Sequence, residues 1–209
     1  AKLPLMITFD GEWGLAMRLR GTPVFPRNMV LGCIQDNKLI YEYGREMARQ
    51  CVQLGVQVNF APVADVNINP KNPVINTRSF GEDPVRVADK VVAYASGLEG
   101  GGVLSVCKHF PGHGDTSEDS HNTLPSVHHD LARLDSVELY PFKRYIYDGY
   151  AGVMTGHLYV PALDKSRNLP SSFSRPIVTG LLKDKLGFRG LCFTDALAMK
   201  GATTSKSDN

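Results

Sequence analysis

The sequence predicts an α/β fold, a (β/α)8 barrel of TIM type that is incomplete in this chain. Five short apolar runs alternate with helical patterns, and this order favours a parallel sheet with right-handed crossovers. Each run also carries its reactive side chains towards its C-terminal end. Those ends converge on one rim in a barrel, whereas an open doubly wound sheet gathers such groups mainly at one switch point. Five contributing runs therefore favour the barrel.

The five apolar runs have the length and the β-branched content of buried strands. They cover residues 3–10, 56–67, 103–110, 151–160 and 190–199, and the first reads as a strand already under way at the start of the sequence. The polar groups at their C-terminal ends are Asp10, Asp65, Lys108 with His109, His157 and Asp195. We expect these side chains to meet at the rim.

Four helical patterns separate the strands. After Asp36, a candidate N-cap, apolar residues recur at three and four positions until Gly55: Leu39, Ile40, Tyr43, Met47, Cys51 and Leu54. Asp83 and Pro84 open a second helix in the arrangement of cap and first helical residue. Its apolar face comprises Val87, Ala88, Val91, Ala95 and Leu98. Residues 130–148, interrupted near Pro141, and residues 175–188 give the remaining patterns.

A triple glycine, Gly100–Gly102, joins the second helix to the third strand. Phosphate-binding loops follow a strand and open a helix, which is the reverse of this order. We therefore expect a tight connection here. The chain also has no G-x-S-x-G elbow, so serine hydrolase chemistry is not indicated.

The domain prediction is a single barrel domain over residues 1–209. A complete barrel typically needs about 250 residues and eight strands, and only five strands are evident here. We therefore expect outer strand-helix units to be missing from this sequence.

Composition and charge exclude several classes of partner. The formal net charge is +2, from 23 basic and 21 acidic residues. This balance gives no electrostatic case for binding nucleic acid or an anionic membrane surface. No apolar run approaches the roughly 18 residues of a membrane span, and no signal-peptide pattern opens the chain. The compartment and the oligomeric state stay open.

The four cysteines are widely spaced and form no C-x-x-C pair: Cys33, Cys51, Cys107 and Cys192. Each has apolar neighbours, so we expect buried free thiols rather than disulfides or zinc ligands. Such thiols are compatible with a reducing compartment.

The segment KHFPGHGDTSEDSH, residues 108–121, holds three of the six histidines and three acidic residues. The four-residue spacing of His109 and His113 suits zinc only on a helix, and the intervening glycine and proline make a helix improbable. A loop could still bind metal through His113, Asp115 and His121. A solvated polar loop is a further alternative.

Carboxylates at strand ends point to glycoside chemistry. Asp195 and Asp10 each end an apolar run, and Glu12 and Trp13 follow Asp10. An N-cap is the alternative role for Asp195. Fixed carboxylates, an aromatic ring and the cationic or polar side chains of Arg18, Arg78, Lys108 and His109 suit a sugar. Glycosidic hydrolysis needs one group at the anomeric carbon and another that protonates the leaving oxygen.

Two long segments, KHFPGHGDTSEDSH and FTDALAMKG, resemble glycoside hydrolase family 3, specifically its β-N-acetylglucosaminidase branch. Four further blocks resemble that family in its order: ITFDGEWGLAMRL, APVADVN, NTRSFGEDP and VMTGHLYVPALD. The resemblance spans Leu3 to Ala202. Two departures stand out. EWG replaces the common EGG after the first aspartate, which places Trp13 near the site, and DAL replaces a double aspartate, which leaves Asp195 as the only candidate there.

The resemblance implies a role for each matching residue. Asp195 corresponds to the nucleophile that forms a covalent glycosyl-enzyme, His121 to the acid/base, and Asp119 to the residue that orients that histidine. Five positions correspond to residues that bind the hydroxyls of the terminal sugar: Asp10, Arg18, Arg78, Lys108 and His109. No metal or organic cofactor is implied.

We therefore expect a retaining, exo-acting β-N-acetylhexosaminidase. Its expected substrates are glycans that end in N-acetylglucosamine, with peptidoglycan fragments favoured. A β-N-acetylglucosaminide phosphorylase is the first enzymatic alternative, because a histidine acid avoids charge repulsion with incoming phosphate. A β-glucosidase of the same family is the second. A sugar-binding scaffold domain is the non-enzymatic alternative.

Overall fold

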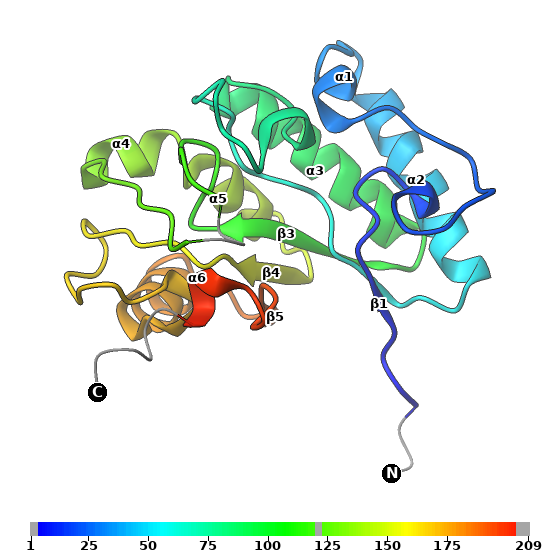
Figure 1. Cartoon of the computed structure of the whole chain (residues 1–209). Coiled ribbons are helices and arrows are strands. Elements are labelled where there is room, and N and C mark those ends of the chain that lie inside the picture. Colours follow the sequence, from blue (N-terminus) through cyan, green and yellow to red (C-terminus); the bar gives the residue numbers. More distant parts are fainter. Residues whose placement is uncertain (1–3, 120–122, 204–209) are drawn as a thin grey trace.

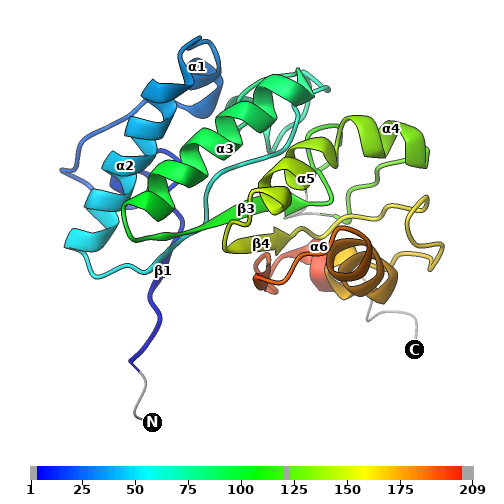
Figure 2. The same ribbon diagram turned by 180° about the vertical axis from the view of Figure 1, so that it is seen from behind.

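The computed structural model describes residues 4–119 and 123–203. Its centre is a five-stranded sheet in which all neighbouring strands are parallel, in the order β1-β2-β3-β4-β5. Figures 1 and 2 show α2, α3 and α5 side by side over one face of this curled sheet. The arrangement is that of half a (β/α)8 barrel, so the predicted α/β class and barrel type are confirmed.

The strands and helices alternate as predicted. In chain order they are β1 (Thr8–Phe9), η1 (Leu15–Met17), α1 (Asn28–Gly32), α2 (Asn37–Gln53), β2 (Val58–Asn59), η2 (Asn76–Arg78), α3 (Pro84–Gly100), β3 (Leu104–Phe110), α4 (Leu131–Ser136), α5 (Tyr140–Tyr147), β4 (Gly152–Thr155), η3 (Ser171–Phe173), η4 (Pro176–Lys185), β5 (Leu191–Thr194) and α6 (Lys200–Thr203). The segment η4 is a π-helix, whereas the other η elements are 3-10 turns.

Both predicted N-caps are confirmed. The Asp36 carboxylate accepts a hydrogen bond from the Lys38 N–H at 2.9 Å, and α2 begins at the next residue. Asp83 caps α3 in the same way, with Pro84 as the first helical residue. These carboxylates satisfy N–H groups that have no partner within the helix.

The predicted apolar faces are confirmed for α3 and only in part for α2. All five residues of the α3 face are buried. On α2, Leu39 and Leu54 are 56% and 49% exposed, so the prediction was wrong at both ends of that face. The closest approach to α3 lies between them, from Tyr41 to Ala48. The first and last turns of the helix extend beyond that contact.

Two glycines allow this close approach of α2 and α3. A Cβ atom on Gly97 would lie 2.1 Å from the Tyr41 carbonyl oxygen, and one on Gly44 would lie 2.4 Å from the Tyr94 carbonyl oxygen. Real Cβ atoms cannot come so close to backbone atoms. The two helices therefore pack backbone against backbone at these positions.

The first two strands are shorter than their apolar runs. Both β1 and β2 contain two residues, although the runs cover residues 3–10 and 56–67. Leu5, Met6 and Ile7 are exposed. Among the described strands β1 has only β2 as a neighbour, and β2 is itself short. Most of the first run therefore has no strand beside it with which to form hydrogen bonds. The prediction of a strand already under way at the start of the sequence was wrong for these residues.

The four cysteines are free thiols, as predicted, but only Cys51 and Cys107 are buried. Cys192 is exposed because it lies on β5, which is an edge strand of the described sheet. Cys33 is exposed because it follows the last residue of the short helix α1. Burial of these two thiols was therefore predicted wrongly.

The helical pattern 130–148 forms two helices, with a break from Val137 to Leu139 and Pro141 in the first turn of α5. The triple glycine forms the tight connection that was predicted. Gly101 is the C-cap of α3, and Gly102 has a φ of +87°, a conformation that favours glycine, two residues before β3 begins.

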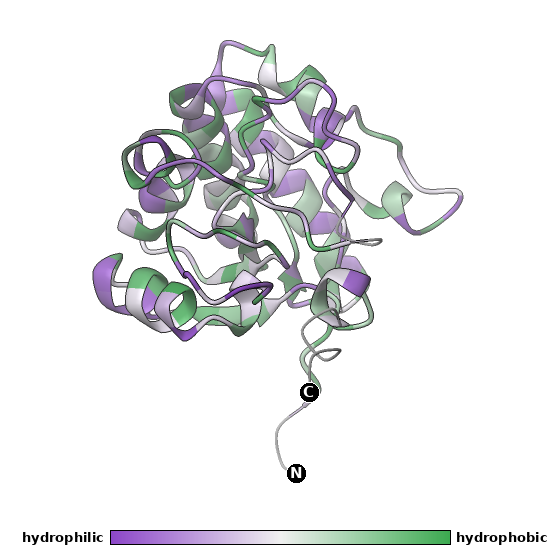
Figure 3. Ribbon diagram, turned by 60° about the vertical axis from the view of Figure 1, so that its left-hand side comes forward, coloured by the Kyte–Doolittle hydropathy of each residue, from purple (hydrophilic) through white to green (hydrophobic). Residues whose placement is uncertain are grey.

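The core has two parts, one on each face of the sheet. The larger cluster joins the outer face of the sheet to the helices. The smaller cluster, on strands β2, β3 and β4, comprises Val58, Val106 and Met154, with Phe60 and Phe193 packed against it. Figure 3 shows hydrophobic and hydrophilic residues interspersed along the long helices. Within the described residues, no helix is both long enough and apolar enough to cross a membrane.

Candidate active site

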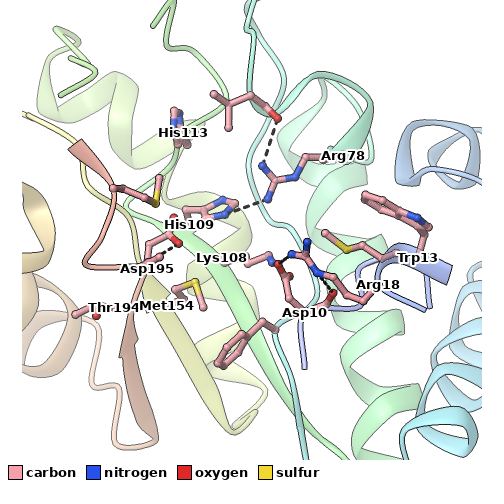
Figure 4. Close-up of a pocket in the computed structure, with 15 residues that line it drawn as sticks. Asp10, Trp13, Arg18, Arg78, Lys108, His109, His113, Met154, Thr194 and Asp195 are labelled. Carbon is pink, nitrogen blue, oxygen red and sulfur yellow. Dashed lines mark hydrogen bonds and ion pairs between the residues drawn. The ribbon is translucent and has the colours of Figure 1, made fainter. Parts of the chain in front are cut away.

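A cavity of about 520 Å³ opens at the C-terminal ends of the strands (Figure 4). Residues from all five strands or directly after them line it, so the strand ends converge on one rim as predicted. Of the polar groups expected there, however, Asp65 and His157 do not line the cavity. The lining residues are Asp10, Trp13, Met17, Arg18, Phe60, Val74, Arg78, Lys108, His109, His113, Met154, Thr194, Asp195, Ala196 and Met199. The structure therefore brings together six of the eight residues predicted from the sequence.

Asp10 and Lys108 form the centre of one wall of the cavity. The Lys108 Nζ lies 2.6 Å from Asp10 Oδ1 and 2.9 Å from Glu12 Oε1. The Arg18 guanidinium pairs with the other oxygen of Asp10. Lys108 is 2% exposed, whereas the Asp10 side chain is 31% exposed. The aspartate can therefore accept hydrogen bonds from a ligand while two cations hold it in place.

Glu12 lies behind this wall and is fully buried. Its carboxylate accepts two parallel hydrogen bonds from Arg78, Nη2–Oε1 at 2.7 Å and Nε–Oε2 at 3.0 Å, besides its ion pair with Lys108. Burial alone would raise the pKa of Glu12, but the positive charges of Lys108 and Arg78 and their hydrogen bonds hold that pKa well below its ordinary value. Glu12 thus provides the buried counter-charge for both cations.

His109 is held in one tautomer. Its Nε2 lies 3.2 Å from Arg78 Nη2, and a guanidinium can only donate, so Nε2 must accept. The proton is then on Nδ1, which donates to Asp65 Oδ2 at 2.7 Å. The Asp65 carboxylate is fully buried and also accepts from the backbone N–H groups of His109 and His113. Asp65 therefore does not line the cavity but fixes the ring that does.

Lys108 and His109 line the same cavity although they are consecutive. Side chains along a regular strand alternate between faces. The pairing of β3 with β4 shifts its register between Lys108 and Phe110. Such an irregularity redirects side chains beside a functional site. Periodicity in the sequence could not predict this.

Asp195 lies at the end of β5, across the cavity from Arg18 in Figure 4. Its backbone N–H donates to the Thr155 carbonyl oxygen at 2.9 Å, and its Oδ1 accepts from the Ala196 N–H at 2.8 Å. Burial raises the pKa of Asp195, but its electrostatic interactions with His109 and Lys108 and the hydrogen bond from the Ala196 N–H lower it more, so the pKa lies below its ordinary value. The carboxylate is therefore an anion at neutral pH.

His113 lines the cavity beside His109, with ring centroids 6.0 Å apart. Its Nδ1 lies 2.7 Å from the Thr116 hydroxyl oxygen. Burial lowers the pKa of His113 to about 4, despite the opposing effect of Asp65, so the ring is neutral at pH 7.

The metal alternative weighed from the sequence joined His113, Asp115 and His121. Asp115 belongs to a different network from His113. Its Oδ2 lies 2.6 Å from His129 Nε2 and 3.3 Å from Arg133 Nη2. His121 lies outside the described residues. The two described members of the set thus have separate partners.

One group in the described part of the chain has the spacing of metal ligands: Asp115, His129 and Glu138. The Arg133 guanidinium lies among them, 3.0 Å from Glu138 and within 3.4 Å of the other two. A cation of the protein therefore already neutralises these carboxylates.

The two remaining residues of the sequence prediction are His121, the expected acid/base, and Asp119, expected to orient it. Asp119 is partly buried but does not line the cavity, and His121 lies outside the described residues. The preceding part of this loop is well anchored. Asn72 Nδ2 donates to the His113 carbonyl oxygen at 2.8 Å, and Asn69 Nδ2 donates to the Thr116 carbonyl oxygen at 3.0 Å.

Three residues of the site carry roles that the sequence did not give them. Glu12 was noted only as a neighbour of Asp10, Asp65 only as a strand end, and His113 only as a metal alternative. The signal for Glu12 and Asp65 was a carboxylate in or beside an apolar run, since such a group must be paired when buried. Trp13 lines the cavity as expected, and the Arg27 guanidinium stacks 3.6 Å from its ring centroid.

Known proteins are similar to this chain over nearly all of its length. Residues 1–209 match the family described as "Glycosyl hydrolase family 3 N terminal domain". The chain is 41% identical to the β-hexosaminidase A of Pseudoalteromonas piscicida, over 96% of this chain and 36% of the relative. It is 39% identical to the β-hexosaminidase LpqI of Mycobacterium tuberculosis, over 98% of this chain and 53% of the relative.

A solved structure is also similar. A family 3 β-N-acetylglucosaminidase from Paenibacillus sp. str. FPU-7 superimposes with a TM-score of 0.93 and 42% identity, over 96% of this chain and 38% of that chain. The chain thus spans between about a third and a half of the length of these three proteins.

Proposed function

Because this chain belongs to glycosyl hydrolase family 3, we propose that the protein is a retaining, exo-acting β-N-acetylhexosaminidase. Its substrates are glycans that end in N-acetylglucosamine, with peptidoglycan fragments favoured. The observation that carries this proposal is the cavity itself, in which the anionic Asp195 faces a wall of paired polar groups. The names of the relatives, β-hexosaminidase and β-N-acetylglucosaminidase, support the choice of sugar.

The terminal sugar binds against the wall opposite Asp195. Asp10 accepts hydrogen bonds from sugar hydroxyls, while Lys108, Arg18 and Arg78 donate to them. His109 contributes its ring edge in a fixed orientation. Each of these groups already has a charged partner within the protein, so binding needs little reorganisation. These five residues form the subsite for the terminal sugar.

Asp195 is the nucleophile. Its carboxylate attacks the anomeric carbon, a carbon–oxygen bond forms to the enzyme, and the bond to the leaving oxygen breaks. The low pKa of Asp195 keeps it ionised for this step. Water then attacks the anomeric carbon from the side that the leaving group occupied. The bond between that carbon and Asp195 breaks, the carboxylate is regenerated, and the sugar is released with retained configuration.

His121 is the acid/base and Asp119 orients it. In the first step His121 gives a proton to the leaving oxygen, and in the second step it removes a proton from the attacking water. A histidine suits both roles near neutral pH because its reference pKa is about 6.5. This assignment rests on the sequence segment that contains both residues.

The proposal is tested with aryl β-glycosides of N-acetylglucosamine, N-acetylgalactosamine and glucose, each with and without phosphate. We expect turnover of the N-acetylated substrates that does not depend on phosphate, and a product of retained anomeric configuration. A requirement for phosphate would indicate a phosphorylase, and preference for the glucoside a β-glucosidase. An inverted product would exclude the covalent mechanism.

The nucleophile is tested by labelling. A slowly reacting 2-fluoro sugar should modify Asp195, because fluorine destabilises the oxocarbenium-like transition states of both steps. Asp195→Asn should lower turnover by no less than roughly 10⁴-fold, while the terminal sugar still binds. Asp184→Asn, an exposed position on η4, is the matched control and should retain activity. Labelling at Asp10 or Glu12 would overturn the assignment.

A further inference from the structure

His157 follows β4 and is fully buried next to the cavity without lining it. Both ring nitrogens are engaged: Nδ1 lies 2.7 Å from the Ser172 hydroxyl oxygen, and Nε2 lies 3.1 Å from the Ala196 carbonyl oxygen. A carbonyl oxygen can only accept, so Nε2 carries a proton and donates it. In the neutral ring Nδ1 then accepts from the Ser172 hydroxyl.

The segment that carries Ser172 is fixed to the two residues that flank His157 in the chain. The Ser171 hydroxyl donates to the Gly156 carbonyl oxygen at 2.7 Å, and the Ser171 N–H donates to the Leu158 carbonyl oxygen at 2.8 Å. The Phe173 ring lies 6.1 Å from the His157 ring, centroid to centroid. The imidazole therefore projects from a rigid base towards the segment that follows β5.

Ala196 connects His157 to the carboxylate of Asp195. The Ala196 carbonyl oxygen accepts from His157 and, at 3.0 Å, from the Met199 N–H. The N–H of the same residue donates to Asp195 Oδ1. With its carbonyl group held, the residue has little freedom to turn, so its N–H stays directed at the carboxylate.

We propose that His157 is a positioning residue for the nucleophile. Through the Ala196 carbonyl it fixes the residue whose N–H holds Asp195 Oδ1, and Oδ2 is thereby presented to the anomeric carbon. Neither the ring nor Ser172 touches the sugar. This inference rests on the proposed function, since it requires Asp195 to be the attacking group.

The test compares two substitutions that separate the ring nitrogens. The amide of His157→Gln places a donor near the position of Nε2, whereas that of His157→Asn reaches only the position of Nδ1. His157→Asn should lower kcat and the rate of labelling by a 2-fluoro sugar by on the order of 10–100-fold, the range for a misplaced reacting group. The dissociation constant of N-acetylglucosamine should not change. His157→Gln should recover most of both rates.

Two further variants complete the experiment. Ser172→Ala removes the group that fixes the ring, so it should lower the labelling rate in the same direction by less. His128→Asn removes an exposed histidine outside the site and should behave as wild type. All variants are made in the full-length protein, and their unfolding midpoints are measured alongside.

The outcomes are decisive for His157. A wild-type labelling rate in folded His157→Asn would overturn the proposal, as would equal rate losses in the Asn and Gln variants. If His157→Asn fails to fold, a wild-type rate in Ser172→Ala overturns it, and a lowered rate with unchanged sugar affinity supports it. Lack of wild-type turnover on all three aryl glycosides would instead contradict the proposed function.

Discussion

Burial divides the carboxylates around the cavity into two kinds. Glu12 and Asp65 are fully buried and hold Arg78, Lys108 and His109 in place. Asp10 and Asp195 are partly exposed and face the cavity. Burying a carboxylate without a partner costs several kcal/mol of folding free energy. A carboxylate at the cavity can instead replace its hydrogen bonds to water with hydrogen bonds to a sugar. We therefore propose that the buried pair organises the site, and that the exposed pair binds the sugar and reacts with it.

The first prediction concerns Glu12. Glu12→Gln removes the buried counter-charge of Arg78 and one of the two carboxylates that pair with the buried Lys108, so the free energy of unfolding at pH 7 should fall by about 3–5 kcal/mol. The pKa of Glu12 is depressed in the folded state, so its contribution is complete above about pH 4.3, the ordinary value, and is lost as the pH falls below it. The difference between wild type and variant should therefore shrink in acid.

Urea unfolding between pH 3 and pH 7 measures this difference. Glu42→Gln, at an exposed position on α2, is the matched control and should change the free energy of unfolding by less than about 0.5 kcal/mol. A deficit in Glu12→Gln that stays the same at every pH would show that the charge of Glu12 is not what stabilises the site.

The second prediction concerns His121 and Asp119. A general acid matters most when the departing oxygen carries negative charge poorly. His121→Ala should therefore strongly reduce the rate at which a sugar aglycone is released. The rate of the first step should fall much less for glycosides of acidic phenols. The glycosyl-enzyme should accumulate, and azide, which needs no deprotonation, should restore turnover. Asp119→Asn should act in the same direction more weakly, because the imidazole remains.

Steady-state rates with leaving groups of graded acidity, with and without azide, provide the measurement. Equal losses for all leaving groups, with no rescue by azide, would show that His121 is not the acid/base and that its loop serves binding alone.

Among the elements, α2 and α3 pack backbone against backbone, and together they support the loop that carries Glu12. The hydroxyl of Tyr94, on α3, donates to the Glu12 carbonyl oxygen at 3.2 Å, and the hydroxyl of Tyr43, on α2, lies 3.5 Å from the same oxygen. Both rings lie in the core, with centroids 5.2 Å apart. The packing of α2 against α3 therefore fixes the position of Glu12, behind the cavity wall, through these two side chains.

The third prediction tests that packing. Gly97→Ala places a methyl group 2.1 Å from a backbone oxygen of α2, and no side-chain rotation can relieve this clash. We expect the free energy of unfolding to fall by about 1–3 kcal/mol, although alanine favours helix formation. Gly180→Ala, in η4 with no atom within 4 Å of the new methyl group, should leave stability unchanged or raise it by up to about 1 kcal/mol. Equal effects of the two substitutions in urea unfolding would contradict the packing argument.

At the scale of the whole molecule, the formal net charge is only +2, and groups of opposite charge meet at one rim of the sheet. The cavity gathers Arg18, Arg78 and Lys108 with Asp10 and Asp195, and Glu12 lies directly behind it. Three cations thus meet three carboxylates within one site. The chemistry proposed here uses these protein groups and requires no metal.

The fourth prediction follows from that chemistry. Prolonged treatment of the full-length protein with a chelator should leave turnover unchanged, because His113 and Asp115 have protein partners in the structure. Activity measured after dialysis, with and without added zinc, checks this. Loss of activity that zinc restores would revive the metal site formed by His113, Asp115 and His121.

The sequence by itself determined the alternation of strands and helices, both N-caps and the polar groups at the strand ends. These features depend on residues within a few positions of one another: apolar periodicity, a capping carboxylate, a proline in the first turn. The same local patterns carry the family motifs, so the family could be predicted as well.

Only the tertiary structure decided how those groups pair. Lys108 and Asp10 are 98 residues apart, and Arg78 and Glu12 are 66 apart. The short length of β1, the exposure of Cys192 and the placement of His157 behind Asp195 depend in the same way on neighbouring strands. Hydrogen bonds and ion pairs act over a few ångströms, so their partners are set by the packing of distant segments and not by local sequence.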